Sequence, residues 1–459
     1  MVKKFCFISF LLALIICPEI HSQPCYNRSF SINNFSQTEN SSKSLFPLSA
    51  LEIFGLFLTI VVAGLANSGG IGGGTLLTSI LIIFFYYTEN QALSIVYSLV
   101  FGGSLGNFFN IAGRRNPQTG KPLIDFDLAL VCMPLMVMGT TFGVVLGRMV
   151  APIVIIVGII VVTAYSTIKV YKKAKRQYAE ESNANRQPIV DNEYYRNLNN
   201  LHPSEIEGED QSNEAYTSDI KLQEALKKEY KLFPKRKYGL LTGLLLIVMF
   251  MSLLKGTDKF PSFIGITYCG IGYWTIFLLS LVFCLVIFFV DQRFLRRNIK
   301  EIRFYHTQIS KRGFEFNRTT VKRLSTLSTV AGVLAGLLGI GGGMIMNPTL
   351  LNIGIPPQEV AATSGFFVVQ TSFISLFQSI LYKDVPLLEE GFFFLVSLIG
   401  SFIVSFLLTF LVKKTKRPSL VLFALISVLI LSIIVTPIFE IWQNSSNLKK
   451  LFEFNSICS

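Results

Sequence analysis

The fold is decided by the stretch Gly64-Leu65-Ala66-Asn67-Ser68-Gly69-Gly70-Ile71-Gly72-Gly73-Gly74. A related stretch lies in the second half of the chain, Gly336-Leu337-Leu338-Gly339-Ile340-Gly341-Gly342-Gly343. Each glycine cluster is followed by a short apolar segment, a polar helix start and a helix rich in small polar residues. Self-similarity of this kind indicates an internal duplication. We therefore predict two related repeats, each with five helical segments.

The composition places these repeats in a membrane. Hydrophobic residues make up 51% of the chain and charged residues only 15%, and the mean hydropathy is +0.53. Such a chain is too apolar for a series of ordinary soluble domains. We predict an all-α polytopic membrane protein with about 12 hydrophobic helices, some of them half-helices. They form two inverted five-helix repeats joined by two helices.

Hydropathy and charge divide the chain into eight predicted segments. Lys3 and Lys4 precede a short apolar run, which is typical of a cleaved signal peptide, although an uncleaved first helix is the alternative. Four Asn-x-Ser/Thr motifs are predicted glycosylation sites, at Asn27, Asn34, Asn40 and Asn444. The segments are a signal peptide (1–22), a lumenal or extracellular polar segment (23–48), membrane repeat 1 (49–171), a largely disordered cytosolic loop (172–237), a linking helix pair (238–290), a basic cytosolic loop (291–324), membrane repeat 2 (325–436) and a lumenal or extracellular tail (437–459).

The positive charges set the predicted orientation. Lys and Arg residues gather in the loops 172–237 and 291–324, and the positive-inside rule makes their side of the membrane cytosolic. The net charge of +13 therefore reflects membrane orientation, and we expect no nucleic-acid partner. Both termini are predicted to be lumenal or extracellular, in a protein of the secretory and endomembrane system or of the plasma membrane.

The same topology predicts that the repeats are inverted. The two linking helices return the chain to the cytosolic side, so repeat 2 starts from the side opposite to repeat 1. This holds whether the segments around each glycine cluster cross the membrane or form a re-entrant hairpin. Inverted repeats with short, glycine-interrupted helices are typical of alternating-access secondary transporters, with the substrate site at the repeat interface.

The glycine breaks are the predicted substrate site. A helix over 341–353 would rise only about 20 Å, against a hydrocarbon core of roughly 30 Å. Helix N-termini at such a break carry N–H donors and suit a small oxyanion. Close helix packing alone is the alternative role for the glycines. The candidate residues are Asn67, Ser68, Gly69, Gly70, Gly72, Gly73, Gly74, Thr75, Gly339, Gly341, Gly342, Gly343, Asn347, Thr363, Ser364 and Gln370.

Three charged residues are weighed separately. Glu89 and Glu359 start equivalent helices and are candidates for coupling to H⁺ or Na⁺, although a carboxylate there also simply complements the helix dipole. Arg148 could attract anions, but the sequence favours an interfacial anchor. We find no catalytic triad, metal-ligand cluster or phosphate-binding loop in the sequence, and expect no enzyme activity, metal or cofactor.

The two glycine clusters resemble those of the TauE/SafE family of anion permeases, also called the sulfite exporter family. A second resemblance lies in Gly120-Lys121-Pro122-Leu123-Ile124-Asp125-Phe126-Asp127-Leu128-Ala129-Leu130, followed by Pro134 and Gly139, which looks like the long eukaryotic members with a signal peptide and a large central loop. Together the resemblance covers about 50–170 and 325–436. It implies movement of sulfite, organosulfonates or related organic anions. Repeat 1 departs from the tighter pattern of repeat 2 by inserting Asn67-Ser68.

We therefore predict a secondary transporter of small anions. Its expected partners are the anionic substrate, the lipid bilayer, H⁺ or Na⁺ as coupling ion, and cytosolic proteins that bind the loop 172–237. Two alternatives stay open at this point. The first is a non-transporting receptor or adaptor that acts through the loop 172–237, and the second is an anion channel.

Overall fold

The computed structural model describes residues 48–116, 122–184, 234–305 and 318–415, with single positions between 419 and 435. The predicted signal peptide, the four predicted glycosylation sites and the middle of the loop 172–237 lie outside these residues. Within the described part of the chain the elements are helices, and β-structure is limited to an isolated bridge between Arg115 and Pro122. The prediction of an all-α protein is confirmed.

Eight of the described helices are long and apolar enough to cross a membrane, which confirms a polytopic membrane protein. They are α2 (Ala50–Ser68), α4 (Glu89–Ile111), α5 (Phe126–Gly147), α9 (Lys235–Lys255), α10 (Ile271–Tyr305), α11 (Arg318–Leu338), α13 (Pro357–Tyr382) and α14 (Leu387–Thr415). Three further helices complete the labelled elements: the long α6 (Pro152–Ala184) and the short α3 (Gly74–Phe85) and α12 (Gly343–Ile353).

Several helices continue into segments that the sequence predicts as loops. Helix α6 runs 13 residues past the predicted end of repeat 1, at 171. Helix α10 ends at Tyr305 and α11 begins at Arg318, so most of the predicted loop 291–324 is helical. Hydropathy marks only the apolar part of a helix, whereas Lys, Arg and Glu are good helix formers that extend it into water. The helices therefore extend beyond the apolar segments at these ends, and the segment boundaries stay predictions.

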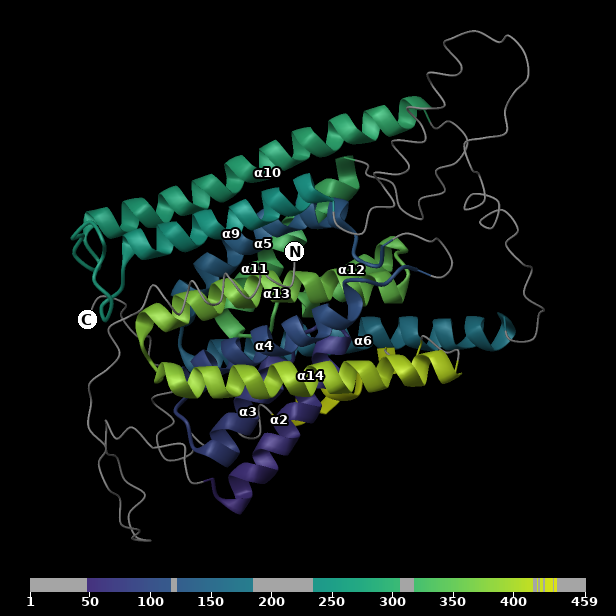
Figure 1. The fold of residues 1–459 in the computed structure, drawn as a ribbon, viewed down its shortest axis with the longest axis horizontal. Coiled ribbons are helices and arrows are strands. Elements are labelled where there is room, and N and C mark those ends of the chain that lie inside the picture. The colour runs from purple at the N-terminus through teal and green to yellow at the C-terminus, as the bar shows by residue number, and fades with distance from the viewer. Residues whose placement is uncertain are drawn as a thin grey trace. The chain divides into compact units, whose positions relative to one another are not determined.

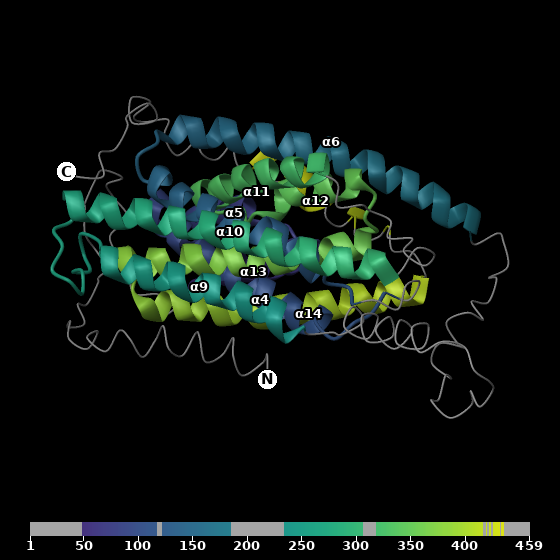
Figure 2. The ribbon, with the colours of Figure 1, turned by 90° about the horizontal axis from the view of Figure 1, so that it is seen from above.

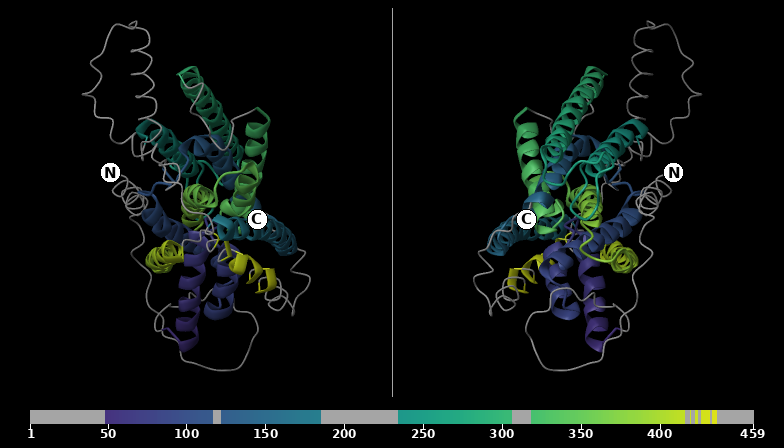
Figure 3. Two further views of the ribbon diagram at one scale, coloured as in Figure 1. Left: turned by 90° about the vertical axis from the view of Figure 1, so that its right-hand side faces the viewer. Right: turned by 90° about the vertical axis from the view of Figure 1, so that its left-hand side faces the viewer.

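Each short helix folds back on the helix before it. Gly55, near the start of α2, faces Phe84 and Phe85 at the end of α3. In the second repeat, the Ser328 hydroxyl of α11 contacts the Met346 sulfur of α12 at 3.8 Å. Figure 3, which looks along the helices, shows α2 and α3 next to each other. Both pairs are helical hairpins whose second arm is too short to cross a membrane, since a helix of 12 residues rises only about 18 Å.

The two hairpins meet tip to tip, backbone against backbone. A methyl group on Gly74 would overlap the carbonyl of Gly339, and one on Gly343 would overlap the carbonyl of Gly70. The contact is reciprocal, because Gly74 and Gly343 hold the same place in their clusters, as do Gly70 and Gly339. Gly70 and Gly339 also have φ values of 72° and 66°, which only glycine adopts readily. These four glycines therefore serve close packing, as the alternative reading of the clusters expects.

Glycines also bring the two repeats together along their helices. Gly139 of α5 faces the backbone of α11, and Gly332 of α11 faces the backbone of α5. In the same way, Gly64 of α2 faces α14, and Gly400 of α14 faces α2. Small residues at such crossings allow backbones to approach closely in a membrane, where van der Waals packing holds helices together. Each pair joins a helix of repeat 1 to a helix of repeat 2.

The polar helices α4 and α13 lie inside together with the apolar α5, whereas the apolar α10 and α14 lie mostly outside. The most hydrophobic stretch of α13 is completely buried and that of α4 is 89% buried, against 22% for α10 and α14. Helices α9 and α10 run side by side past α5 (Figure 1). Helix α6 lies at the edge seen in Figure 2, where the Ser166 hydroxyl donates to the Met344 carbonyl of α12 at 3.0 Å.

The tip contact predicts a matched pair of glycine variants. We expect Gly343→Ala to destabilise the protein by about 1–3 kcal/mol or more, the usual cost of overpacking, because the facing group is backbone. Gly243→Ala in α9 is the control, since no atom lies within 4 Å of the added methyl group. Melting of the detergent-solubilised protein would measure both. Equal melting temperatures would contradict the tip contact.

Candidate functional site

Three asparagine side chains hold the first break. Asn107 Nδ2 donates to the Asn67 carbonyl at 2.7 Å, and Asn347 Nδ2 donates to the Gly69 carbonyl at 2.9 Å. Asn67 Nδ2 donates to the Ala63 carbonyl at 2.8 Å. A helix that ends inside a membrane leaves backbone carbonyls without partners, and protein groups must satisfy them. Asn67 and Asn347, predicted to bind substrate, therefore bind the broken backbone through their amide nitrogens.

Several polar atoms near this break have no hydrogen-bond partner among the described residues. They are Asn67 Oδ1, Asn347 Oδ1 and Ser364 Oγ, all from buried predicted site residues, whereas the partnerless Gln370 Oε1 lies further along α13. Ser364 lies directly against Gly70, and its Cβ is 3.2 Å from where a Cβ on that glycine would stand. A buried polar atom without a partner costs free energy of roughly 1–3 kcal/mol. These atoms are therefore available to a ligand or to water.

Two helices begin at the breaks without side-chain caps. Neither Gly73 before α3 nor Gly342 before α12 supplies a side-chain hydrogen bond to the helix that follows. The first N–H groups of an α-helix have no partner within the helix, and the dipole adds positive potential there. The uncapped ends are the hydrogen-bond donors of this region, whereas the partnerless amide oxygens are acceptors. An oxyanion suits the helix ends, and a donor such as water suits the amides.

The remaining predicted residues serve local structure or are packed at the tips. The Ser68 hydroxyl donates to the Leu65 carbonyl of its own helix at 2.8 Å. Thr363 Oγ1 accepts a hydrogen bond from the Asp125 backbone N–H at 3.1 Å, which ties α13 to the start of α5. Gly72 and Gly341 each lie against the opposite hairpin, and Gly69, Gly73, Gly342 and Thr75 are buried in the same region.

Of the two carboxylates predicted to bind a coupling ion, only Glu359 has a side chain within the described structure. Glu89 is the first residue of α4, and its side chain lies outside the described part of the structure. Glu359 Oε1 accepts a hydrogen bond from Asn116 Nδ2 at 2.5 Å, at the predicted cytosolic end of α13. Asp125 caps α5 by accepting from two backbone N–H groups of its first turn. A third carboxylate, Glu390, is buried with one oxygen lacking a partner among the described groups.

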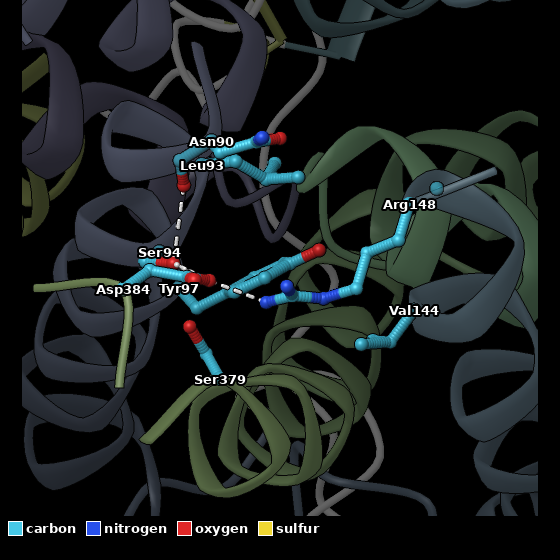
Figure 4. Close-up of a pocket in the computed structure, with 9 residues that line it drawn as sticks. Asn90, Leu93, Ser94, Tyr97, Val144, Arg148, Ser379 and Asp384 are labelled. Atoms are coloured by element: carbon cyan, nitrogen blue, oxygen red, sulfur yellow. Dashed lines mark hydrogen bonds and ion pairs between the residues drawn. The ribbon is translucent and has the colours of Figure 1, made fainter. Parts of the chain in front are cut away.

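A polar pocket lies at the opposite, predicted lumenal end of α4 and α13 (Figure 4). Arg148 donates to Asp384 in an ion pair, and the Ser94 hydroxyl donates to the same carboxylate oxygen at 3.3 Å. The cavity volume is about 10 Å³, close to what one water molecule needs. A larger ligand therefore requires these side chains to move. The lining residues are Asn90, Leu93, Ser94, Tyr97, Val144, Gly147, Arg148, Ser379 and Asp384.

Tyr97 connects this pocket to the second break. Its ring lines the pocket, and its hydroxyl donates to the Gly336 carbonyl at 2.6 Å, one turn before the break. Leu93 and Val96 of the same helix lie against Gly339. The second break thus lies behind the pocket, whereas Asn107 and Ser364 surround the first break nearer the predicted cytosolic ends of α4 and α13.

Sequence reasoning missed the residues of this pocket. It treats Arg148 as an interfacial anchor and selects neither Tyr97 nor Asp384. The signal in the sequence is that Arg148 and Asp384 stand in short turns after membrane helices on the same predicted side, with opposite charges. Only the fold brings the two turns together, because 236 residues separate them.

The chain resembles known proteins in one family. Residues 324–451 match the family model described as Sulfite exporter TauE/SafE. Three relatives from Arabidopsis thaliana are named Sulfite exporter TauE/SafE family proteins 1, 5 and 2. They are 30%, 28% and 28% identical, over 89%, 96% and 91% of this chain and 88%, 97% and 90% of their own lengths. No solved structure matches the chain.

The asparagine contacts predict a second matched pair of variants. We expect Asn347→Leu to destabilise the protein by about 1–3 kcal/mol, because the Gly69 carbonyl loses its donor inside the membrane. Thr349→Val is the control in the same buried helix, since the Thr349 hydroxyl bonds only the Ile345 carbonyl one turn back. Thermal melting compares them. An Asn347→Leu protein as stable as the control would show that the break does not depend on this amide.

Proposed function

The chain belongs to the sulfite exporter TauE/SafE family, a family of membrane transporters, and on that premise we propose that it carries sulfite or a related small oxyanion by alternating access. The substrate reaches the uncapped ends of α3 and α12 from one side of the membrane at a time. The two re-entrant hairpins form the barrier between the sides. We thus propose a mechanism and a substrate class in addition to transport.

The observation that carries the proposal is the tip-to-tip contact of the two hairpins. The contact is made by backbone groups of Gly70, Gly74, Gly339 and Gly343, with no side chain between them. A seal of this kind breaks when one hairpin tilts by a small amount relative to the other. Rigid-body rocking of one repeat against the other about a fixed site is how many inverted-repeat transporters work.

A series of polar residues along α13 supports a path for the substrate. Polar atoms without a partner among the described residues occur along this buried helix, on Ser364, Gln370, Gln378 and Ser379. Polar groups inside a membrane protein are costly unless water or a ligand meets them. A helix with this many unsatisfied groups fits a transport path better than a packed core. The series runs from the first break to the pocket beside Arg148.

We assign the coupling ion as a proton carried by Glu390. Its side chain is buried at the start of α14, and Oε2 has no hydrogen-bond partner within the described structure. Its neighbour Glu389 instead accepts a hydrogen bond from the Tyr87 hydroxyl at 2.8 Å. A carboxyl group in an apolar setting prefers the neutral, protonated form and releases its proton when water reaches it.

Transport in proteoliposomes tests the substrate path. We expect saturable uptake of sulfite, with sulfate and methanesulfonate as competitors, and a drop of about tenfold for Gln370→Leu, which corresponds to about 1.4 kcal/mol. Thr371→Val is the matched control, because the Thr371 hydroxyl bonds only backbone carbonyls of its own helix. If the folded wild-type protein shows no saturable flux of any anion, the proposed function is wrong.

The proton assignment is tested in the same vesicles. We expect uptake by the wild-type protein to respond to a pH gradient and that by Glu390→Gln to lose this response, because an amide cannot release a proton at this position. Anion exchange without a gradient should persist in the variant. Glu389→Gln serves as the control. A Glu390→Gln protein that still follows the pH gradient would rule out this residue as the proton carrier.

A further inference from the structure

We infer that Arg148 binds the substrate anion at the pocket of Figure 4, and that Asp384 occupies this binding position as a tethered anion when the substrate is absent. The inference rests on the proposed function and adds the recognition step at one end of the path. The ligand class is a compact oxyanion with at least two oxygens, such as sulfite, sulfate or a sulfonate group.

The geometry around Arg148 is that of an anion site already filled. Its guanidinium donates to Asp384 and stacks over the Tyr382 ring, with 3.5 Å between Cζ and the ring centroid. The Ser94 hydroxyl donates to the same Asp384 oxygen at 3.3 Å. Arg148 contacts one Asp384 oxygen, Oδ2, while Lys259 Nζ lies near Oδ1, and a sulfur oxyanion likewise presents several oxygens to more than one donor. The Arg148 guanidinium and the Ser94 hydroxyl can therefore donate either to the Asp384 carboxylate or to a bound anion.

Three cations, Arg148, Lys255 and Lys259, lie in this region and favour an anion there. Lys259 Nζ lies 3.6 Å from Asp384, so this carboxylate has two cationic partners. Lys255 is buried against aromatic rings, with its Nζ 5.0 Å from the Tyr273 centroid, and it has no carboxylate partner among the residues described. The other acids of this end are the exposed Asp258, the buried Glu389, which accepts from the Tyr87 hydroxyl, and the buried Glu390, to which we assign a proton. A cation without a partner at low dielectric is costly, and an arriving anion offsets that cost.

Further hydroxyl groups in this region can donate hydrogen bonds to a bound anion. The Ser379 hydroxyl lines the pocket and is buried without a hydrogen-bond partner among the described residues. Burial raises the pKa of the nearby Tyr268 to about 12, with Tyr382 adding to the effect, so this phenol stays a neutral donor. Hydroxyl groups suit an oxyanion because they donate without adding charge.

Displacing Asp384 links binding to movement. Arg148 follows α5 of repeat 1, whereas Asp384 lies in the turn between α13 and α14 of repeat 2. The ion pair therefore joins the two repeats at the predicted lumenal end. The cavity of about 10 Å³ is too small for a sulfur oxyanion, so binding requires the carboxylate to leave. An anion that takes Arg148 removes the contact that holds this end closed.

Titration calorimetry of the full-length protein in neutral detergent tests the exchange. Sodium sulfite and sodium sulfate are the probes, in gluconate buffer at constant ionic strength. In the wild type the Asp384 carboxylate competes with the added anion for Arg148 and so lowers the apparent affinity. We therefore expect Asp384→Asn to bind either anion at least about fivefold more tightly. Arg148→Gln should lose measurable binding. Arg148→Lys, which keeps the charge without the fork, should bind about tenfold more weakly than the wild type.

Controls separate this inference from a purely structural ion pair. Lys259→Gln removes an exposed cation beside the same carboxylate and should change affinity less than Arg148→Lys does. If Asp384→Asn and Arg148→Lys both leave anion affinity unchanged while lowering the melting temperature, the pair is structural and the inference fails. Saturable flux in those variants would at the same time leave the proposed function standing. Adding vesicles with anionic phosphatidylglycerol distinguishes a lipid phosphate: binding that only this lipid competes for, with no response to sulfite or sulfate, also overturns it.

Discussion

The carbonyl groups of Gly70 and Gly339 fill the space that a side chain at Gly343 or Gly74 of the opposite hairpin would need. The rest of the membrane part depends on this contact. It requires glycine at the first position of both short helices, it fixes how deep each hairpin reaches, and it places two helix N-termini back to back near the middle of the molecule. The asparagines around the first break and the tyrosine behind the second then satisfy the carbonyl groups that such a break leaves open.

The outer helices follow from the same constraint. A break inside a membrane must be shielded from lipid, and the buried α4 and α13 carry the polar side chains that face it. Helices α9, α10 and α14 present their apolar residues outward and need few polar groups of their own. Glycines at the crossings of α5 with α11 and of α2 with α14 draw the repeats close enough for the tips to touch. The contact between the hairpin tips and the shielding of the breaks from lipid thus depend on different residues.

Much of the fold could be predicted from the sequence, because hydropathy, glycine spacing and positive charge each report on it. The two breaks, the short helices after them and the polar character of α4 and α13 are all visible in residue patterns. Helix ends such as Ala184 and Arg318 could not be placed, since a helix in water leaves no hydropathy signal. The site was predicted only in part. Asn67 lies at the first break and the fold brings Asn347 of the second half to it, yet their nitrogens bind backbone, and the ion pair of Arg148 with Asp384 depends on a tertiary contact that no local pattern encodes.

Helix α6 has 33 residues, so it is about 50 Å long, against roughly 30 Å of hydrocarbon. Part of it therefore stands outside the bilayer as a rigid rod. Its inner portion is bonded to α12 through Ser166 and Met344, next to the second glycine cluster. A protein that binds the outer end of this rod would act on α12, since a sideways force in the aqueous phase becomes torque on the short helix that follows the second glycine cluster. Because of the length of α6, a force applied outside the membrane can reach the membrane part of the molecule.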